Sequence, residues 1–249
     1  MNYCNDHGAF YGASSDLCPW CSKGNQSELL NKKFSFSTIE QFDKHVSKSV
    51  DGYIELHDAV CKIAEYFIDD NTNVFDIGCS TGTLIKKIDT TVQRNGVKLI
   101  GIEPEWNFAK ELIPTERINW LHADATIGKV FNNASLITSI FTIQFIQTRK
   151  RRDLIKDIYN GLNDGGAFIF AEKIRSDNSF AQDVFTFAYY DFKLKSFSGT
   201  QILEKEKDLR YQLKPLTLED NKKLIFEAGF KTASVFWQRW NFTAMLCIK

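Results

Sequence analysis

The sequence predicts an α/β fold with a doubly wound, mostly parallel, seven-stranded sheet and helices on both faces. Two observations support this prediction. Short apolar runs alternate with longer amphipathic stretches across residues 41–249, and a glycine turn follows the first run. A third observation sets the N-terminus apart, because cysteine and histidine gather in the first 21 residues. We therefore divide the chain into a small zinc module at 1–22, a linker at 23–40 and the α/β domain at 41–249.

The composition supports one large domain with a small appendage. The chain has 249 residues, of which 43% are hydrophobic, so it has enough apolar material for a core. Its 31 basic residues balance its 31 acidic residues, which excludes a polyanion binder that is basic all over. We see no apolar stretch of the roughly 18 residues that a membrane helix needs, and no signal peptide. We expect a cytoplasmic protein.

The first half of the domain alternates helices and strands. Apolar residues at helical spacing, such as Val60, Ala64 and Phe67, predict a helix before the first strand. Pro104 ends the second strand. The expected elements are helix 41–68, strand 73–78, helix 83–93, strand 97–103, helix 105–113 and strand 118–123.

The second half continues the alternation and ends in a hairpin. The stretch 149–162 is amphipathic and is closed by Asn163–Gly166. The expected elements are strand 134–141, helix 149–162, strand 167–171, helix 178–195, a charged segment 204–214, helix 218–228 and strands 231–238 and 240–248. The last two strands predict an antiparallel hairpin on the mostly parallel sheet.

The N-terminal cysteines have the spacing of zinc ligands. The pattern is Cys4-x2-His7-x10-Cys18-x2-Cys21, in which each pair suits one side of a tetrahedral site. Four protein ligands leave no open position, so the predicted role is structural. The alternatives are a tail with incidental cysteines and, without an export signal, a less favoured disulfide.

The other histidines and cysteines have simpler interpretations. Three histidines have no spacing that indicates a metal, and two cysteines read as small core residues. These residues are His45, His57, His122, Cys61 and Cys247.

Acidic residues and glycines follow the first three predicted strands. The first turn reads Asp76-Ile-Gly-Cys-Ser-Thr-Gly82, which is neither a dinucleotide fingerprint nor a P-loop. Glu103 ends the second strand and Asp124 follows the third. Ligands of open α/β sheets bind beyond the carboxyl ends of the strands. A carboxylate at the position of Glu103 is a suitable acceptor for two ribose hydroxyls.

This pattern resembles the class I S-adenosylmethionine-dependent methyltransferases, which have a Rossmann-like methyltransferase fold. The resemblance implies that the glycine turn lies against the methionine part of the cofactor, that Glu103 binds the ribose, and that Asp124 with Ala125 reads the adenine. The expected cofactor-binding residues are Tyr53, Asp76, Gly78, Cys79, Ser80, Gly82, Glu103, Pro104, Asp124, Ala125 and Phe141.

A closer resemblance rests on longer blocks. Phe-Asp-Ile-Gly-Cys-Ser (75–80), Phe-Thr-Ile-Gln-Phe (141–145), Ala-Glu-Lys (171–173), Tyr-Asp-Phe-Lys (190–193) and Trp-Asn-Phe (240–242) are similar to the carboxy-S-adenosylmethionine synthases. That family implies a homodimer that converts S-adenosylmethionine and prephenate into a carboxylated cofactor for tRNA uridine modification. It also implies an arginine for the added carboxylate within the segment matching 204–214, and an asparagine before the Phe-Thr block.

This chain departs from that family at both positions. Ile140 precedes the Phe-Thr block, and our alignment places Asp208 where the arginine is expected, with Arg210 two residues away. Since a carboxylate is held best by a cationic fork, we favour methyl transfer, with the synthase reaction as the alternative. Methyl transfer is an in-line displacement that depends mainly on positioning. The catalytic candidates are Tyr53, Gln144 and Arg210.

Each of the leading catalytic candidates also has a structural interpretation. Tyr53 fits the apolar face of a helix, and Gln144 is suited to satisfying buried backbone groups.

A basic run offers a nucleic-acid contact. Arg149, Lys150, Arg151 and Arg152 are adjacent, and with the zinc module they favour a base in tRNA or DNA as the acceptor. Solvation of a helix surface is the alternative. A third hypothesis, from a different class, is a binding module that holds cofactor without turnover.

Overall fold

The computed structural model describes residues 2–4, 9–11, 36 and 39–249. The chain divides into two compact units, Met1–Ser35 and Phe36–Lys249. In the first unit, β1 (Asn2–Cys4) pairs antiparallel with β2 (Ala9–Tyr11). The predicted zinc ligands His7, Cys18 and Cys21 lie outside the described residues, as does the side chain of Cys4. The zinc module therefore stays a prediction.

The second unit is built on the predicted seven-stranded sheet. Its order is β5-β4-β3-β6-β7-β9-β8. The five strands from β5 to β7 are parallel, and β9 pairs antiparallel with both β7 and β8. The strands are β3 (Asn73–Ile77), β4 (Lys98–Ile102), β5 (Ile118–Leu121), β6 (Ala134–Ile140), β7 (Leu162–Lys173), β8 (Ser234–Arg239) and β9 (Phe242–Ile248). The doubly wound α/β prediction, including its terminal hairpin, is confirmed.

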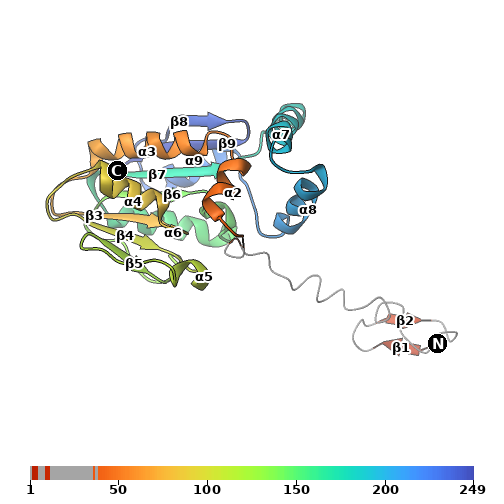
Figure 1. Cartoon of the computed structure of the whole chain (residues 1–249), viewed down its shortest axis with the longest axis horizontal. Coiled ribbons are helices and arrows are strands. Elements are labelled where there is room, and N and C mark those ends of the chain that lie inside the picture. Colours follow the sequence, from red (N-terminus) through yellow and green to blue (C-terminus); the bar gives the residue numbers. More distant parts are fainter. Residues whose placement is uncertain (1, 5–8, 12–35, 37–38) are drawn as a thin grey trace. The chain divides into compact units, whose positions relative to one another are not determined.

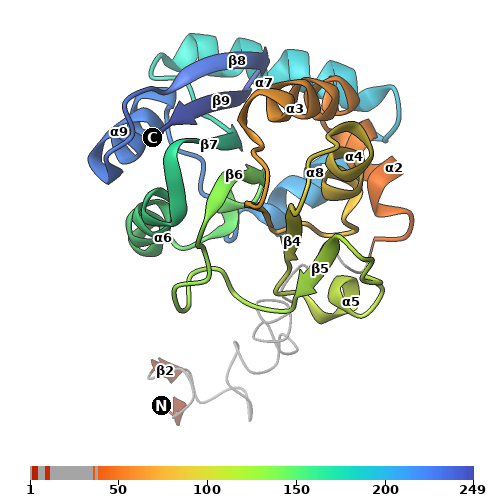
Figure 2. The same ribbon diagram turned by 90° about the vertical axis from the view of Figure 1, so that its left-hand side faces the viewer.

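Helices cover both faces of this sheet (Figure 2). On one face, α3 (Tyr53–Phe67) and α4 (Thr83–Thr91) bury an apolar stripe that includes Leu56, Val60 and Ile85. On the other face, α6 (Thr148–Gly161) and α9 (Leu218–Ala228) bury Leu154, Ile155, Ile158 and Ile225. The predicted core cysteines Cys61 and Cys247 are buried and free.

Three helices lie beyond the carboxyl ends of the parallel strands (Figure 1). They are α2 (Phe42–Ser49), α7 (Ser179–Leu194) and α8 (Gly199–Leu209). Short α5 (Trp106–Ala109) follows β4, and the 3-10 helix η2 (Ile143–Phe145) follows β6. Ser198 starts α8 with a capping box, because its side chain accepts from the Gln201 amide and the Gln201 side chain accepts from the Ser198 amide. No helix among the described residues is long and apolar enough to cross a membrane.

Several boundaries differ from the prediction. The single helix expected at 41–68 is broken into α2 and α3 at Val50–Gly52, where Gly52 has a φ of 75°. Helical apolar spacing continues through the break, so periodicity alone does not reveal it. The strand expected at 167–171 extends over Leu162–Lys173. The charged segment 204–214 begins within α8.

Candidate functional site

The glycine turn after β3 has an unusual backbone. Gly78, Ser80 and Gly82 all have positive φ, at 69°, 46° and 73°. The amides of Gly78 and Cys79 donate to the Ile102 carbonyl at 2.7 and 3.2 Å, which ties the turn to β4. A Cβ on Gly78 would overlap the Thr142 side chain. The turn therefore brings its backbone close to the space beyond the strand ends.

Glu103 is held at the end of β4 by two backbone amides. Ser80 N donates to Oε2 and Glu105 N donates to Oε1, both at 2.8 Å. Glu103 is 4% exposed, and burial raises the pKa of its carboxyl group. Each carboxylate oxygen keeps a further lone pair after its amide bond. The backbone thus fixes the orientation of the Glu103 carboxylate.

Asp76 lies beneath this turn and is buried. Its Oδ1 accepts from Thr138 Oγ1 at 2.7 Å. Burial raises the pKa of Asp76 to about 7, with Glu103 adding to the rise. Burial also raises the pKa of the Cys79 thiol, so this cysteine is not a nucleophile. Its contribution is the backbone of the turn.

Asp124 follows β5 on the same edge of the sheet. Its Oδ1 accepts from the Thr126 amide at 2.8 Å, and its Oδ2 lies 3.9 Å from Lys150 Nζ. Ala125 beside it is buried, whereas Pro104 is exposed and accepts from the His122 ring at 3.1 Å. We call Gly78–Gly82, Glu103 and Asp124 the carboxyl edge.

Aromatic rings run from the glycine turn toward α7. Tyr53 and Phe141 stack at 6.4 Å between ring centroids, Phe141 meets Phe242 edge-on at 5.4 Å, and Phe242 meets Tyr189 at 5.2 Å. Phe141 has a φ of 56°, which is rare for an aromatic residue. Burial raises the pKa of Tyr53, so its hydroxyl stays protonated. These four rings form a continuous row that packs in and against the core, and we call this row the ring wall.

Gln144 has the backbone partner that the sequence left open as an alternative. Its Oε1 accepts from the Lys173 amide at 2.7 Å. Arg151, predicted to belong to a surface basic run, is 1% exposed and donates to the Gln144 and Ile146 carbonyls at 2.8 and 2.9 Å. It also faces buried Glu172. Arg151 therefore supports η2 from inside the fold and is not available for the nucleic-acid contact predicted for the basic run.

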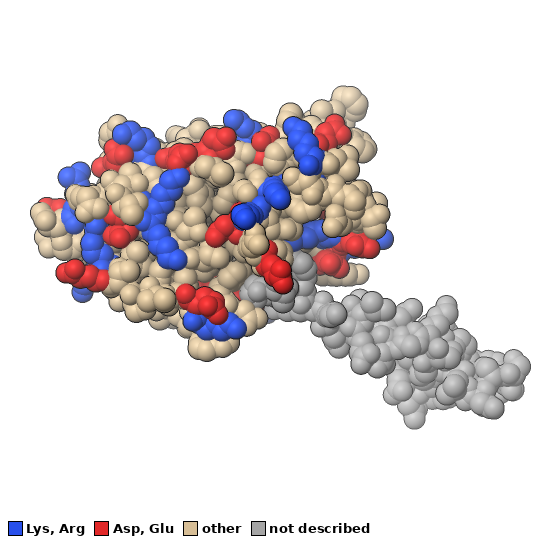
Figure 3. All heavy atoms as spheres, in the orientation of Figure 1, with Lys and Arg blue, Asp and Glu red and all other residues tan. Residues whose placement is uncertain are grey.

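The rest of the basic run has local partners. Arg149 Nε donates to Gln147 Oε1 at 3.1 Å, Lys150 Nζ donates to Thr126 Oγ1 at 3.1 Å, and Arg152 pairs with Glu227 at 2.8 Å. On the face shown in Figure 3, basic and acidic side chains of the described residues are interspersed.

Two lysines lie near one carboxylate beyond β7, and a third lysine precedes that carboxylate on α8. Lys173 Nζ and Lys193 Nζ lie 3.7 and 4.0 Å from Glu206 Oε1. Lys205, next to Glu206 on α8, contacts His45 Nε2 at 3.1 Å. Burial lowers the pKa of all three lysines, that of Lys205 to about 8. We call Lys173, Lys193, Lys205 and Glu206 the lysine cluster.

The lysine cluster touches the ring wall. Lys173 Nζ lies 5.0 Å from the Tyr189 ring centroid and 5.9 Å from that of Phe242, and Lys193 Nζ lies 5.2 Å from the Tyr189 ring. These are cation–π distances. The rings therefore connect Tyr53, at the start of α3, to the cluster.

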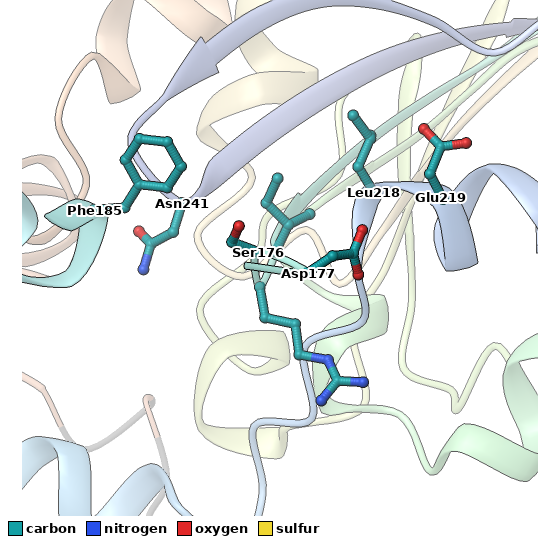
Figure 4. Close-up of a pocket in the computed structure, with 8 residues that line it drawn as sticks. Ser176, Asp177, Phe185, Leu218, Glu219 and Asn241 are labelled. Atoms are coloured by element: carbon teal, nitrogen blue, oxygen red, sulfur yellow. The ribbon is translucent and has the colours of Figure 1, made fainter. Parts of the chain in front are cut away.

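A cavity of about 220 Å³ has a different set of lining residues (Figure 4). It is lined by the loop after β7, the start of α9, one residue of α7 and the turn between β8 and β9: Ile174, Arg175, Ser176, Asp177, Phe185, Leu218, Glu219 and Asn241. None of the residues predicted to bind cofactor lines it. Within the described residues, no group of three or more histidine, cysteine or acidic side chains is arranged to hold a metal ion.

Comparison with known sequences identifies the family. No protein-family model matches the chain. A carboxy-S-adenosyl-L-methionine synthase of Staphylococcus epidermidis is 39% identical over 220 residues, which cover 86% of this chain and 95% of that protein. The chain belongs to the carboxy-S-adenosyl-L-methionine synthase family. The synthase of Methylococcus capsulatus is 30% identical over 237 residues, 90% of this chain and 96% of that protein.

Solved structures agree on the fold of this synthase family member. Human N-acetylserotonin methyltransferase, in complex with S-adenosylmethionine, has a TM-score of 0.51 at 15% identity and covers 84% of this chain and 59% of that one. A putative methyltransferase in complex with the Haloferax volcanii Trm112 activator has a TM-score of 0.56 at 12% identity and covers 79% and 92%. The Rossmann-like methyltransferase fold is confirmed.

In this synthase family member, the resemblance predicts an arginine for the added carboxylate within 204–214, but other residues of that segment face inward. Asp208 and Arg210 are both exposed on α8, and Arg210 is its C-cap. Lys205 and Glu206 face inward instead. Ile140, in place of the expected asparagine, ends β6 half-buried.

Proposed function

We propose that the chain binds S-adenosylmethionine at its carboxyl edge and catalyses methyl transfer from it. The observation that carries this proposal is the position of Glu103, held by the Ser80 and Glu105 amides with both carboxylate oxygens able to accept again. This arrangement suits the two hydroxyls of a ribose. Asp124 and Ala125 lie where an adenine would be read, and the glycine turn admits the methionine part.

The chemistry requires little beyond positioning. Bound S-adenosylmethionine supplies a methyl group activated by a positively charged sulfur. The residues of this chain hold the reactants in line, and correct orientation contributes a large share of the rate. Tyr53, with its raised pKa, donates a hydrogen bond rather than accepting a proton. Gln144 positions the start of the loop after β7 through the Lys173 amide.

Cofactor binding is tested first by mass spectrometry of the small molecules that copurify with the protein. S-adenosylmethionine or S-adenosylhomocysteine is the expected finding, followed by saturable binding of S-adenosylhomocysteine in calorimetry. No nucleoside and no binding would overturn the proposal.

Synthesis of carboxy-S-adenosylmethionine is the second candidate, favoured by the 39% identity to a protein of that name. Incubation with S-adenosylmethionine and prephenate should then yield the carboxylated nucleoside, and the product would serve tRNA uridine modification. The exposed Asp208 and Arg210 weigh against it, since neither supplies an inward cationic fork. If this assay gives no carboxylated nucleoside but the protein binds the cofactor, methyl transfer remains the proposed reaction.

The N-terminal module is proposed to hold one zinc ion through Cys4, His7, Cys18 and Cys21. The support is the ligand spacing alone. Metal analysis of the purified protein should find about one equivalent, and Cys18→Ser should lose it. Nucleic-acid binding by this module with Arg149, Lys150 and Arg152 is tested by tRNA binding with and without the metal.

A further inference from the structure

The loop at residues 141–146, which we call the η2 loop, follows β6 and packs against the glycine turn. Its first residue, Phe141, has a φ of 56° and donates its amide hydrogen to the Ala171 carbonyl of β7 at 2.7 Å. The next side chain, Thr142, lies directly over Gly78, because a Cβ added to Gly78 would overlap it. The position of the η2 loop therefore sets the space on one side of the glycine turn.

Arg151 of α6 holds the η2 loop from inside the fold. It is 1% exposed, and its guanidinium group donates to the Gln144 carbonyl at 2.8 Å and to the Ile146 carbonyl at 2.9 Å. Removing a charged side chain from water is costly, and an apolar side chain in its place would avoid that cost. The planar guanidinium group offers what an apolar side chain lacks, since it fixes two points of one loop at the same time.

Glu172 of β7 faces the same loop from the sheet. It is 2% exposed, and its Oε1 has no hydrogen-bond partner among the described residues. Burial raises the pKa of its carboxyl group well above the usual range, while Arg151 and the backbone amides of Ile143 and Gln144 favour the charged form. Glu172 therefore acts on the amide end of η2, whereas Arg151 binds carbonyls at its other end.

Two further contacts tie the η2 loop to neighbouring backbone. The Lys173 amide donates to Gln144 Oε1 at 2.7 Å, and the Lys214 amide donates to the Gln144 carbonyl at 3.0 Å. Both donors belong to the main chain, so most substitutions at 173 or 214 leave them in place. Arg151 and Glu172 act through their side chains instead, which makes their contribution open to substitution.

We propose that Arg151 and Glu172 are positioning residues for the cofactor site, because together they hold the η2 loop against the glycine turn. Both are almost fully buried, so they act through Phe141 and Thr142 and do not touch the cofactor. This inference rests on the proposed function and deepens it. A purely structural role would change only the stability of the fold, whereas a positioning role changes the affinity of molecules that remain folded.

Calorimetric titration of the full chain with S-adenosylhomocysteine tests the proposal. Arg151→Lys keeps the positive charge but loses the planar fork, so at least one carbonyl of the η2 loop loses its donor. We expect about tenfold weaker binding at an unchanged stoichiometry, which is the factor typical of one hydrogen bond to a charged group. Glu172→Gln keeps the size of the side chain and should weaken binding several-fold. It keeps the proposal testable if Arg151→Lys does not fold.

Ile158→Val is the matched control for stability. Ile158 is fully buried on the same helix, and loss of a methyl group there also destabilises the fold. This variant should bind S-adenosylhomocysteine as the wild type does. Hydrogen–deuterium exchange gives the local readout: in Arg151→Lys, amides of the η2 loop should exchange faster, while amides of β8 and β9 should exchange as in the wild type.

The outcomes separate this inference from the proposed function. A wild type that does not bind S-adenosylhomocysteine overturns the proposed function, and this inference with it. A wild type that binds, together with Arg151→Lys and Glu172→Gln of unchanged affinity, overturns this inference alone. Equal losses of affinity in Arg151→Lys and Ile158→Val also overturn it, since the effect would then follow stability and not the position of the loop.

Discussion

The carboxyl edge and the lysine cluster differ in how their charged groups are held. At the carboxyl edge, Glu103 is fixed by two backbone amides at 2.8 Å. In the lysine cluster, Lys173 and Lys193 meet their carboxylate only at 3.7 and 4.0 Å and otherwise rest against rings. The comparison teaches that the first region is held by short backbone hydrogen bonds, while the second is held by longer ion pairs and contacts with rings.

The largest effect should come from Gly78→Ala. The new Cβ would overlap Thr142 at a backbone φ of 69°. We expect the unfolding free energy to fall by at least about 3 kcal/mol, with loss of cofactor binding. Gly165→Ala is the control, because Gly165 has a φ of 78° but open space around it, so only the conformational cost of about 1–2 kcal/mol applies. Urea unfolding and calorimetry measure both. Equal losses in the two variants would contradict close approach at the turn.

Asp76→Asn tests whether Asp76 is protonated in the native chain and how this changes the unfolding free energy with pH. Burial raises the pKa of Asp76 from 3.8 to about 7, so the native chain keeps a proton that the unfolded chain releases above about pH 4. The unfolding free energy of the wild type therefore falls as the pH rises from about 4 to about 7. Asparagine still accepts from Thr138 but does not titrate. Between pH 4.5 and pH 8, the unfolding free energy of Asp76→Asn should therefore fall less than that of the wild type, by on the order of 3 kcal/mol.

Urea unfolding at both pH values measures this difference. The control is Asp69→Asn, at an exposed position. Parallel pH profiles of Asp76→Asn and wild type would show that Asp76 is ionised in the native state.

Glu103→Gln tests the fixed acceptor itself. The amide group must turn an N–H toward either Ser80 N or Glu105 N, so one of two hydrogen bonds is lost together with the charge. We expect S-adenosylhomocysteine to bind about ten- to a hundredfold more weakly in calorimetry. Glu116→Gln, at an exposed position, should bind normally. Unchanged affinity in Glu103→Gln would remove the ribose contact from the proposal.

The smallest effect should come from the lysine cluster, whose charged groups lack short ion pairs. Without a ligand, Lys193→Met replaces a buried ammonium group by an apolar side chain of similar length. The unfolding free energy should stay the same or rise by about 1 kcal/mol. Urea unfolding of the ligand-free protein measures it, with Lys207→Gln as the exposed control. A fall of more than 1 kcal/mol would show that Glu206 and the rings satisfy Lys193 fully.

The carboxyl edge could be predicted because it depends on local signals. Short apolar runs locate the strands, and parallel pairing brings their carboxyl ends to one edge whatever the intervening helices do. Gly78, Glu103 and Asp124 therefore fall together as soon as the strand ends are identified. The parallel strands β5 to β7 and the hairpin follow from the same alternation.

The lysine cluster could not be predicted in this way. Its members come from β7, α7 and α8, and each has the local appearance of a solvated charge on an amphipathic segment. Arg151 was misassigned for the same reason, since its burial depends on Gln144 and Ile146, which lie before α6. Only tertiary packing decides which charge of a run faces inward. The break at Gly52 is similarly invisible to apolar periodicity.

Phe141 has a backbone conformation that glycine adopts more easily than phenylalanine does. Its left-handed backbone, with a φ of 56°, costs more than glycine would at the same position, yet glycine has no ring to join Tyr53 to Phe242. Glycine at 141 would relieve about 1–2 kcal/mol of backbone strain, but it would lose ring packing against Tyr53, Phe242 and the core, which is worth more. The packing of one aromatic ring therefore holds residue 141 in a backbone conformation that the residue alone would avoid.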